Sequence, residues 1–194
     1  MKDVSRETEA LRIYSALLRK WNPAINLVAP STLVELETRH IADSRQIADL
    51  ATQAAGRWVD LGSGGGLPGL IVAILRPDLS VTLIESDKRK CSFLRNAARE
   101  IGLPNLEICN ERIEQAPPLG ADNISARALA PLPLLMSYVG RHLDPKGRAW
   151  LMKGRNWQSE VEDARRDWQF NLVVHPSQTD PDAVILELTG IRHV

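Results

Sequence analysis

The sequence predicts an α/β protein with a mostly parallel, seven-stranded sheet and a helical segment before it. Three observations favour this fold. From Arg57 onward, short apolar runs alternate with helical patterns, as in successive βαβ units. The first of these runs leads directly into a glycine-rich turn at 62–66. The next run, Val81 to Ile84, is followed by an acid, Glu85, at the edge where parallel strands present ligands.

The start of the chain has helical patterns only. We expect one domain over residues 1–194, in which a helical segment, residues 1–55, packs on a Rossmann-like core, residues 56–194. An irregular connector at 22–27 and a second helix from about 32 to 53 should complete the segment. The first helix should bury one face, because apolar side chains recur at helical spacing: Leu11, Tyr14, Leu17, Leu18 and Trp21.

The core can be divided into elements by the spacing of its apolar runs. Strands are expected at 57–61, 81–85, 106–110, 122–126, 148–152, 169–175 and 183–189. Helices are expected at 67–75, 87–101, 131–142 and 156–167. Only a polar segment, 177–182, separates the last two strands, so these should form an antiparallel hairpin.

The glycine-rich turn predicts a nucleotide-binding loop, because glycine permits positive φ angles and lets backbone amides approach a ligand closely. Glu85, nineteen residues after Gly66, can accept both hydroxyls of a ribose. Starting at Gly64, the loop matches the dinucleotide pattern Gly-x-Gly-x-x-Gly, so NAD stays open. Starting at Asp60, it resembles the first motif of class I S-adenosylmethionine-dependent methyltransferases. A seven-stranded sheet fits that second interpretation.

Methyl transfer from a sulfonium is an in-line displacement, for which a protein mainly supplies orientation and a water-poor pocket. The fourth expected strand ends in Ser125-Ala126-Arg127-Ala128. The Asn-Pro-Pro-Tyr or Asp-Pro-Pro-Tyr motif of amino-group methylating enzymes does not occur there, nor does the Pro-Cys of enzymes that attack a pyrimidine covalently. The sequence therefore favours an acceptor with a free lone pair, such as a ring nitrogen, which needs no general base.

Five motifs follow one another along the chain: Trp21-Asn22-x-x-Ile25-Asn26-Leu27, Arg39-His40-Ile41-x-Asp43-Ser44, Asp60 to Gly69, Ser125-Ala126-Arg127-Ala128 and Lys153-Gly154. Together they resemble the glucose-inhibited division protein B family, bacterial methyltransferases of small-subunit ribosomal RNA. The resemblance covers nearly the whole chain. It implies methylation of N7 of the 16S guanine usually numbered 527, with S-adenosylmethionine as cofactor and 16S ribosomal RNA or the small ribosomal subunit as partner.

The resemblance also implies a set of cofactor-binding residues. Glu85 matches an acid for which many relatives have Asp, and a slightly longer carboxylate can still reach a ribose. Glu114 matches one of a pair beside the adenine, although its side chain could equally be a solvated loop acid. The full set is Gly62, Gly64, Gly66, Leu67, Glu85, Ile113, Glu114 and Arg127.

Arg127 is the one residue expected to take a catalytic role. It directly follows an apolar strand at the carboxyl edge of the sheet, where open α/β folds bind their ligands. The resemblance places it at the mouth shared by cofactor and substrate. A structural salt bridge is the alternative, and variants can separate the two roles.

RNA contact can depend only on local charge, because 24 basic side chains balance 24 acidic ones. Lys153 and Arg155 flank Gly154 after the fifth expected strand and are candidate phosphate contacts. His40 is a third candidate. It lies three residues before Asp43 on an expected helix, where a packing or capping role is equally consistent with the spacing.

Several classes are disfavoured by composition. Charged residues are spread along the first twenty positions, and no apolar run is long enough to span a bilayer. We therefore expect a cytoplasmic protein without a membrane segment. No ligand spacing for a metal appears. We expect a monomer without an obligate protein partner. The alternatives to a methyltransferase are an NAD-dependent oxidoreductase and a ribosome-associated protein that binds the cofactor without turnover.

Overall fold

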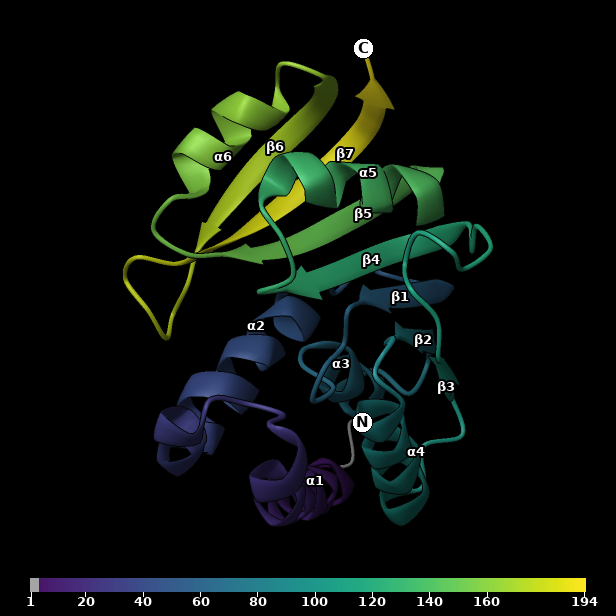
Figure 1. Cartoon of the computed structure of the whole chain (residues 1–194), viewed down its shortest axis with the longest axis vertical. Coiled ribbons are helices and arrows are strands. Elements are labelled where there is room, and N and C mark those ends of the chain that lie inside the picture. Colours follow the sequence, from purple (N-terminus) through teal and green to yellow (C-terminus); the bar gives the residue numbers. More distant parts are fainter. Residues whose placement is uncertain (1–3) are drawn as a thin grey trace.

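Seven strands form one sheet in the order β3-β2-β1-β4-β5-β7-β6 in the computed structural model, which describes residues 4–194 (Figure 1). Strands β1 to β5 pair with one another in parallel, and β7 is antiparallel to both β5 and β6. The predicted sheet and its final hairpin are confirmed. The strands are β1 Arg57–Leu61, β2 Ser80–Ile84, β3 Leu106–Cys109, β4 Ala121–Arg127, β5 Leu143–Lys153, β6 Trp168–Pro176 and β7 Val184–His193.

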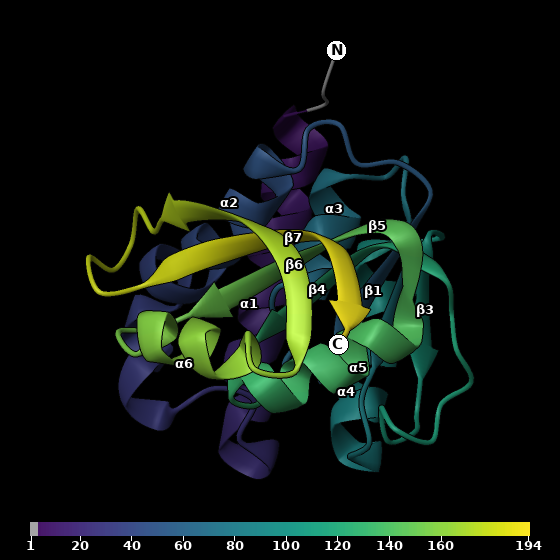
Figure 2. The same cartoon turned by 90° about the horizontal axis from the view of Figure 1, so that it is seen from above.

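Helices cover both faces of this sheet (Figures 1 and 2). One face packs against the N-terminal segment, α3 and α4, and the other packs against α5 and α6. Among residues 4–194, no helix combines the length and the apolar character needed to cross a membrane. The helices are α1 Val4–Ile25, η1 Pro30–Glu35, η2 Leu36–Ile41, α2 Ala42–Leu50, α3 Gly69–Leu75, α4 Lys88–Ile101, α5 Leu132–His142 and α6 Trp157–Ala164.

The second helical segment differs from the single helix expected over 32–53. It begins as a 3-10 helix, η1, continues as a π-helix, η2, and ends as α2. A π-helical turn is wider than an α-helical one, and such turns occur often at functional sites. Here the π-helix carries His40, and the first turn of α2 carries Asp43.

A buried asparagine turns the chain between α1 and η1. The side-chain oxygen of Asn22 accepts hydrogen bonds from the backbone amides of Leu27 at 2.8 Å and Val28 at 2.9 Å. Asn26 takes a positive φ of 48°, which asparagine tolerates better than most residues. This connector sets η1 and η2 beside α1, and so places the π-helix over the sheet edge described next.

Candidate active site at the carboxyl edge of the sheet

The site lies where the strand order reverses, because β2 follows β1 on one side and β4 pairs with β1 on the other. Open α/β sheets bind ligands outside the carboxyl ends of strands at such a point. Backbone hydrogen bonds, one of them to the end of β2, hold the loop after β1 in place. Ser63 donates its amide to the carbonyl of Ile84 at 3.0 Å, and Gly66 donates to the carbonyl of Ser63 at 2.7 Å.

Three glycines of the loop are required for packing. A Cβ on Gly62 would lie 2.5 Å from Leu129, and one on Gly66 would lie 2.9 Å from Leu70. A Cβ on Gly69 would lie 2.5 Å from the side chain of Asp60, so α3 packs directly on β1. The helix begins at Gly69, two residues later than the sequence predicted, and the peptide bond between Leu67 and Pro68 is cis.

Gly64 is different, because its side-chain position is open. A Cβ built there meets nothing closer than the Gly62 carbonyl at 3.9 Å, while its φ of +56° lies in the region that favours glycine. This open space is a cradle in which the backbone can contact a ligand and which a side chain would fill. Gly64 thus differs from Gly62, Gly66 and Gly69 in having open space at its side-chain position.

Glu85 connects the end of β2 to this cradle. Its Oε2 accepts the Gly64 amide at 2.8 Å, and its Oε1 accepts the Asp87 amide at 2.8 Å. Each carboxylate oxygen retains a further lone pair for a ribose hydroxyl. The side chain of Asn110 donates to the Glu85 carbonyl at 2.9 Å and joins the loop after β3 to the same place.

A buried polar network lies under the loop. The Trp58 indole donates to Ser125 Oγ at 2.9 Å, and Ser125 in turn donates to Asp60 Oδ1 at 2.6 Å. Asp60 is 0% exposed, and its Oδ2 has no hydrogen-bond partner among the described residues. Burial raises the pKa of Asp60 to about 6, although the Ser125 hydrogen bond acts in the opposite direction. A buried carboxylate with one unpartnered oxygen is costly for stability, which suits a ligand-binding role.

The raised pKa of Asp60 should make the stability of the protein depend on pH. The folded state holds the Asp60 proton more tightly than the unfolded state, so the free energy of unfolding should fall as pH rises from about 4 to 6. Asp60→Asn removes this effect. The stability of the variant relative to wild type should therefore increase by roughly 1 to 3 kcal/mol between pH 4 and pH 8.

Urea denaturation at both pH values measures this difference. The control is Glu162→Gln, which removes an exposed carboxylate from α6. If the stability difference between Asp60→Asn and wild type does not change with pH, this result would contradict the raised pKa of Asp60.

Tyr14 of α1 is a residue for which the sequence predicted only core packing. Its hydroxyl donates to the carbonyl of Gly65 at 2.7 Å, inside the glycine loop. Burial raises the pKa of Tyr14 above its ordinary value, so the hydroxyl keeps its proton and stays a donor. A Cβ on Gly65 would lie 3.3 Å from Leu27. The N-terminal segment therefore supports the loop from behind.

Arg127 ends β4 beside the π-helix. Its Nη1 lies 3.2 Å from His40 Nδ1 and 3.6 Å from Asp43 Oδ2. On the other side of the imidazole, His40 Nε2 lies 2.7 Å from the hydroxyl of Thr32. That hydroxyl donates its own hydrogen to the carbonyl of Ala29 at 2.9 Å, so it must accept from His40. Arg127 therefore donates to His40 Nδ1, and His40 Nε2 donates to the Thr32 hydroxyl.

The protonation of His40 agrees with this order. Burial, followed by the nearby Arg127 guanidinium, lowers the pKa of His40 to about 4. The imidazole is therefore neutral at pH 7, with Nε2 protonated and Nδ1 free to accept from Arg127. The sequence proposed His40 as an RNA contact. In the structure its Nδ1 lies against Arg127 and its Nε2 against the Thr32 hydroxyl.

Asp43 connects the same arginine to the hairpin between β6 and β7. Its Oδ1 accepts from the Thr179 hydroxyl at 2.9 Å and from Gln46 Nε2 at 3.1 Å. Gln46 also accepts the backbone amide of Gln178 at 2.8 Å. These contacts hold the hairpin loop against α2.

A cavity of about 440 Å³ lies between this loop, Arg127 and the end of β5. Lys153 and Glu160 form its far wall, with Nζ and Oε2 2.7 Å apart. Lys153 also donates to the Ala130 carbonyl at 2.7 Å. Leu129 lines the cavity and contacts the Gly62 position, so the cavity adjoins the glycine loop.

Comparison with known proteins decides the family. A family profile described as rRNA small subunit methyltransferase G matches residues 7–183. Proteins named ribosomal RNA small subunit methyltransferase G are 63% identical in Paracoccus denitrificans, covering 98% of both chains, and 51% identical in a Ruegeria species, covering 99% of this chain and 95% of that one. The chain belongs to the rRNA small subunit methyltransferase G family. It is an S-adenosylmethionine-dependent methyltransferase, and the NAD alternative is wrong.

Solved structures agree on the fold of the methyltransferase. An S-adenosylmethionine-dependent methyltransferase from Aquifex aeolicus matches with a TM-score of 0.61 at 14% identity, over 90% of this chain and 97% of that chain. A glycopeptide N-methyltransferase in complex with sinefungin matches with a TM-score of 0.65 at 13% identity, over 78% and 87% of the chains. The predicted class I fold is confirmed.

The residues of this methyltransferase fit the cofactor. The open position at Gly64 leaves room for a ligand beside its backbone, and the Glu85 carboxylate has free lone pairs. Asp60, four residues before Gly64, has one carboxylate oxygen without a hydrogen-bond partner among the described residues. When bound, S-adenosylmethionine supplies an electrophilic methyl group. The chain's own residues would hold the nucleoside part and exclude water from the edge of the sheet.

Leu67, Ile113 and Glu114 are the other residues for which the sequence predicted cofactor contacts. The side chain of Leu67 is buried in the core, so only its backbone can meet the cofactor. Ile113 is buried, and its carbonyl lies 2.8 Å from Nε2 of the buried His142. Glu114 is exposed, with its Oε1 3.8 Å from Arg112. Its side chain thus resembles the solvated acid that the sequence left open.

The two predicted RNA cations of the methyltransferase differ from each other. Lys153 is only 8% exposed and is paired with Glu160. Arg155 is 79% exposed and lies 3.9 Å from Asp182, within reach of solvent and of a phosphate.

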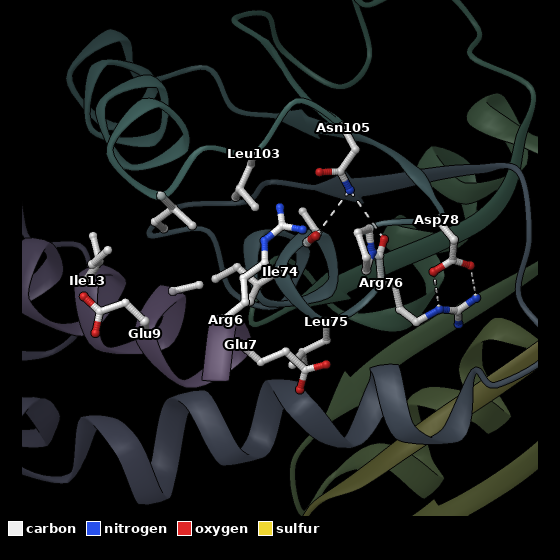
Figure 3. A pocket seen from close by; sticks show the side chains of 14 residues that line it. Arg6, Glu7, Glu9, Ile13, Ile74, Leu75, Arg76, Asp78, Leu103 and Asn105 are labelled. Carbon is white, nitrogen blue, oxygen red and sulfur yellow. Dashed lines mark hydrogen bonds and ion pairs between the residues drawn. The ribbon is translucent and has the colours of Figure 1, made fainter. Parts of the chain in front are cut away.

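Another cavity, of about 530 Å³, has side chains of Arg6, Arg76 and Asn105 in its lining (Figure 3). It is lined by α1 and by the segments that precede β2 and β3, so it faces the amino ends of these strands. Arg76 pairs there with Asp78 at 2.7 Å. The Asn105 amide donates to the Leu79 carbonyl at 3.1 Å. These contacts stabilise turns remote from the glycine loop.

Proposed function

We propose that this methyltransferase transfers the methyl group of S-adenosylmethionine to N7 of a guanine in 16S ribosomal RNA. One observation supports this acceptor above others: the ionisable side chains of the cavity are engaged in pairs. Arg127 lies against Asp43, and Lys153 is paired with Glu160. A ring nitrogen with a free lone pair needs no group to remove a proton, so such a cavity suits N7.

The work of the protein is then orientation. The guanidinium of Arg127 is held by His40 and Asp43 at the mouth of the cavity, where it can donate to the O6 or phosphate of a guanine nucleotide. A base that leaves its stack can enter a cavity of this size. In-line transfer then depends on how well N7 is aligned with the methyl group of a cofactor held at the glycine loop.

The names of the relatives support ribosomal RNA of the small subunit as the substrate. We propose Arg155 as a phosphate contact at the rim, because it is exposed beside the cavity. The same substrate supports action in the cytoplasm. A single chain of one domain, without an obligate protein partner, stays a prediction.

The product identifies the reaction. The protein, labelled S-adenosylmethionine and unmodified small-subunit RNA or particles should give one labelled nucleoside, 7-methylguanosine, by mass spectrometry after digestion. The binding-protein alternative predicts cofactor binding without any labelled RNA. A methylated base other than 7-methylguanosine would also refute the proposal.

A further inference from the structure

Glu160 is the one acidic side chain on the wall formed by β5 and α6, and its two oxygens differ. Oε2 accepts the Lys153 ammonium at 2.7 Å and the Leu132 backbone amide at 2.7 Å. Oε1 accepts no hydrogen bond from any described residue, and it is not among the buried unpartnered atoms. Since the side chain is 26% exposed and lines the cavity, Oε1 is the available acceptor on this wall.

The position of this carboxylate is fixed from three elements. Lys153 ends β5, Leu132 begins α5, and Glu160 lies in the first turn of α6. The Lys153 ammonium also donates to the Ala130 carbonyl, so the pair is anchored to the loop after β4. An acceptor held in this way can discriminate between ligands, because it needs little reorganisation to bind.

The hydrogen-bonding groups of guanine complement those on the two walls of the cavity. Its O6 and N7 are acceptors, whereas N1–H and the exocyclic N2 amino group are donors on another edge. Arg127 on one wall is a donor, and Glu160 Oε1 is an acceptor. Adenine has an unprotonated N1 and no amino group at position 2, so it lacks both of these donors.

We propose, building on the function proposed above, that Glu160 is the residue that selects guanine, by accepting hydrogen bonds from N1–H and the N2 amino group through Oε1. Lys153 is then a positioning residue that holds Oε2, not a contact to RNA phosphate. The Glu160 carboxylate does not take part in the transfer of the methyl group.

The test compares guanosine with inosine at the methylated position of an otherwise identical RNA. Inosine lacks only the N2 amino group. Wild type should methylate the guanosine RNA about 10- to 100-fold faster, because the inosine RNA leaves a charged acceptor partly unpaired. Equal rates on both RNAs would overturn the proposal, whatever the variants do.

Two variants separate recognition from structure. In Glu160→Gln, the amide oxygen should take over the Lys153 and Leu132 donors, which turns the amide NH₂ toward the cavity. This variant should be slow on both RNAs, with a ratio near one. Lys153→Met breaks the same ion pair but keeps the carboxylate, so it should retain the preference for guanosine.

The outcomes are distinct. Loss of the preference in both variants would assign the pair a structural role only, and so would a preference that survives Glu160→Gln. Calorimetry with S-adenosylhomocysteine should give wild-type affinity in both variants, because neither residue lies in the glycine loop. If wild type forms no 7-methylguanosine on the guanosine RNA, the proposed function fails. If wild type forms 7-methylguanosine but methylates the guanosine and inosine RNAs at equal rates, only the proposed role of Glu160 fails.

Discussion

Gly64→Ala should weaken the binding of S-adenosylhomocysteine by 10- to 100-fold while the protein stays folded. The Cβ would enter the open space beside the loop, and overpacking of a fitted site costs about 1 to 3 kcal/mol. The positive φ should cost about 1 to 2 kcal/mol of stability in addition. Isothermal titration calorimetry measures the affinity, and thermal unfolding measures the stability.

Gly102→Ala is the matched control. Gly102 ends α4 with a φ of +75°, and a Cβ there meets nothing within 4 Å. This variant should lose a similar amount of stability and no affinity. Equal affinity in Gly64→Ala and Gly102→Ala would show that the loop is not the cofactor site. NAD should give no heat of binding with wild type.

Arg127→Lys should reduce single-turnover methyl transfer by about 100-fold, because misplacing a reacting group by about 1 Å can cost that much. A lysine cannot donate from a planar fork to two acceptors at once. His40 and Asp43 contact the guanidinium, so the variant should also lose about 1 kcal/mol of stability. Rapid-quench assays with labelled cofactor measure the rate.

Arg148→Lys provides the comparison for this variant. Arg148 lies on β5 and pairs with Glu187, away from the glycine loop. Replacing it should affect stability by a similar amount and leave the rate unchanged. If Arg127→Lys unfolds more readily yet turns over at the wild-type rate, Arg127 is a structural residue.

Five of the seven strands could be predicted to within one residue at each end from the apolar runs and the turn residues around them. The prediction was less accurate for β5, which begins five residues before 148, and for β7, which ends four residues after 189. The helical segment over 32–53 could not be divided in advance. Its π-helix places His40 against Arg127, which lies 87 residues further along the chain. Contacts between such distant residues leave no local pattern, so the wider turn had no visible cause in the sequence.

The same limit explains two contacts that the sequence does not show. Lys153 follows a strand next to a glycine and looks like a surface cation, but α6 returns across the end of β5 and brings Glu160 to it. Tyr14 fits an apolar helical stripe, and only the packed structure shows its hydroxyl on Gly65. Glycine spacing predicted the loop itself, since its positive φ angles are a local requirement.

The acceptor atom is the central claim, and a single-atom substitution in the RNA tests it most directly. An RNA with 7-deazaguanosine at the methylated position replaces N7 by a carbon and keeps O6, N1–H and the N2 amino group. Wild-type protein should bind this RNA with nearly unchanged affinity and transfer no methyl group to it, while the guanosine RNA is methylated. Methylation of the 7-deazaguanosine residue would contradict the account.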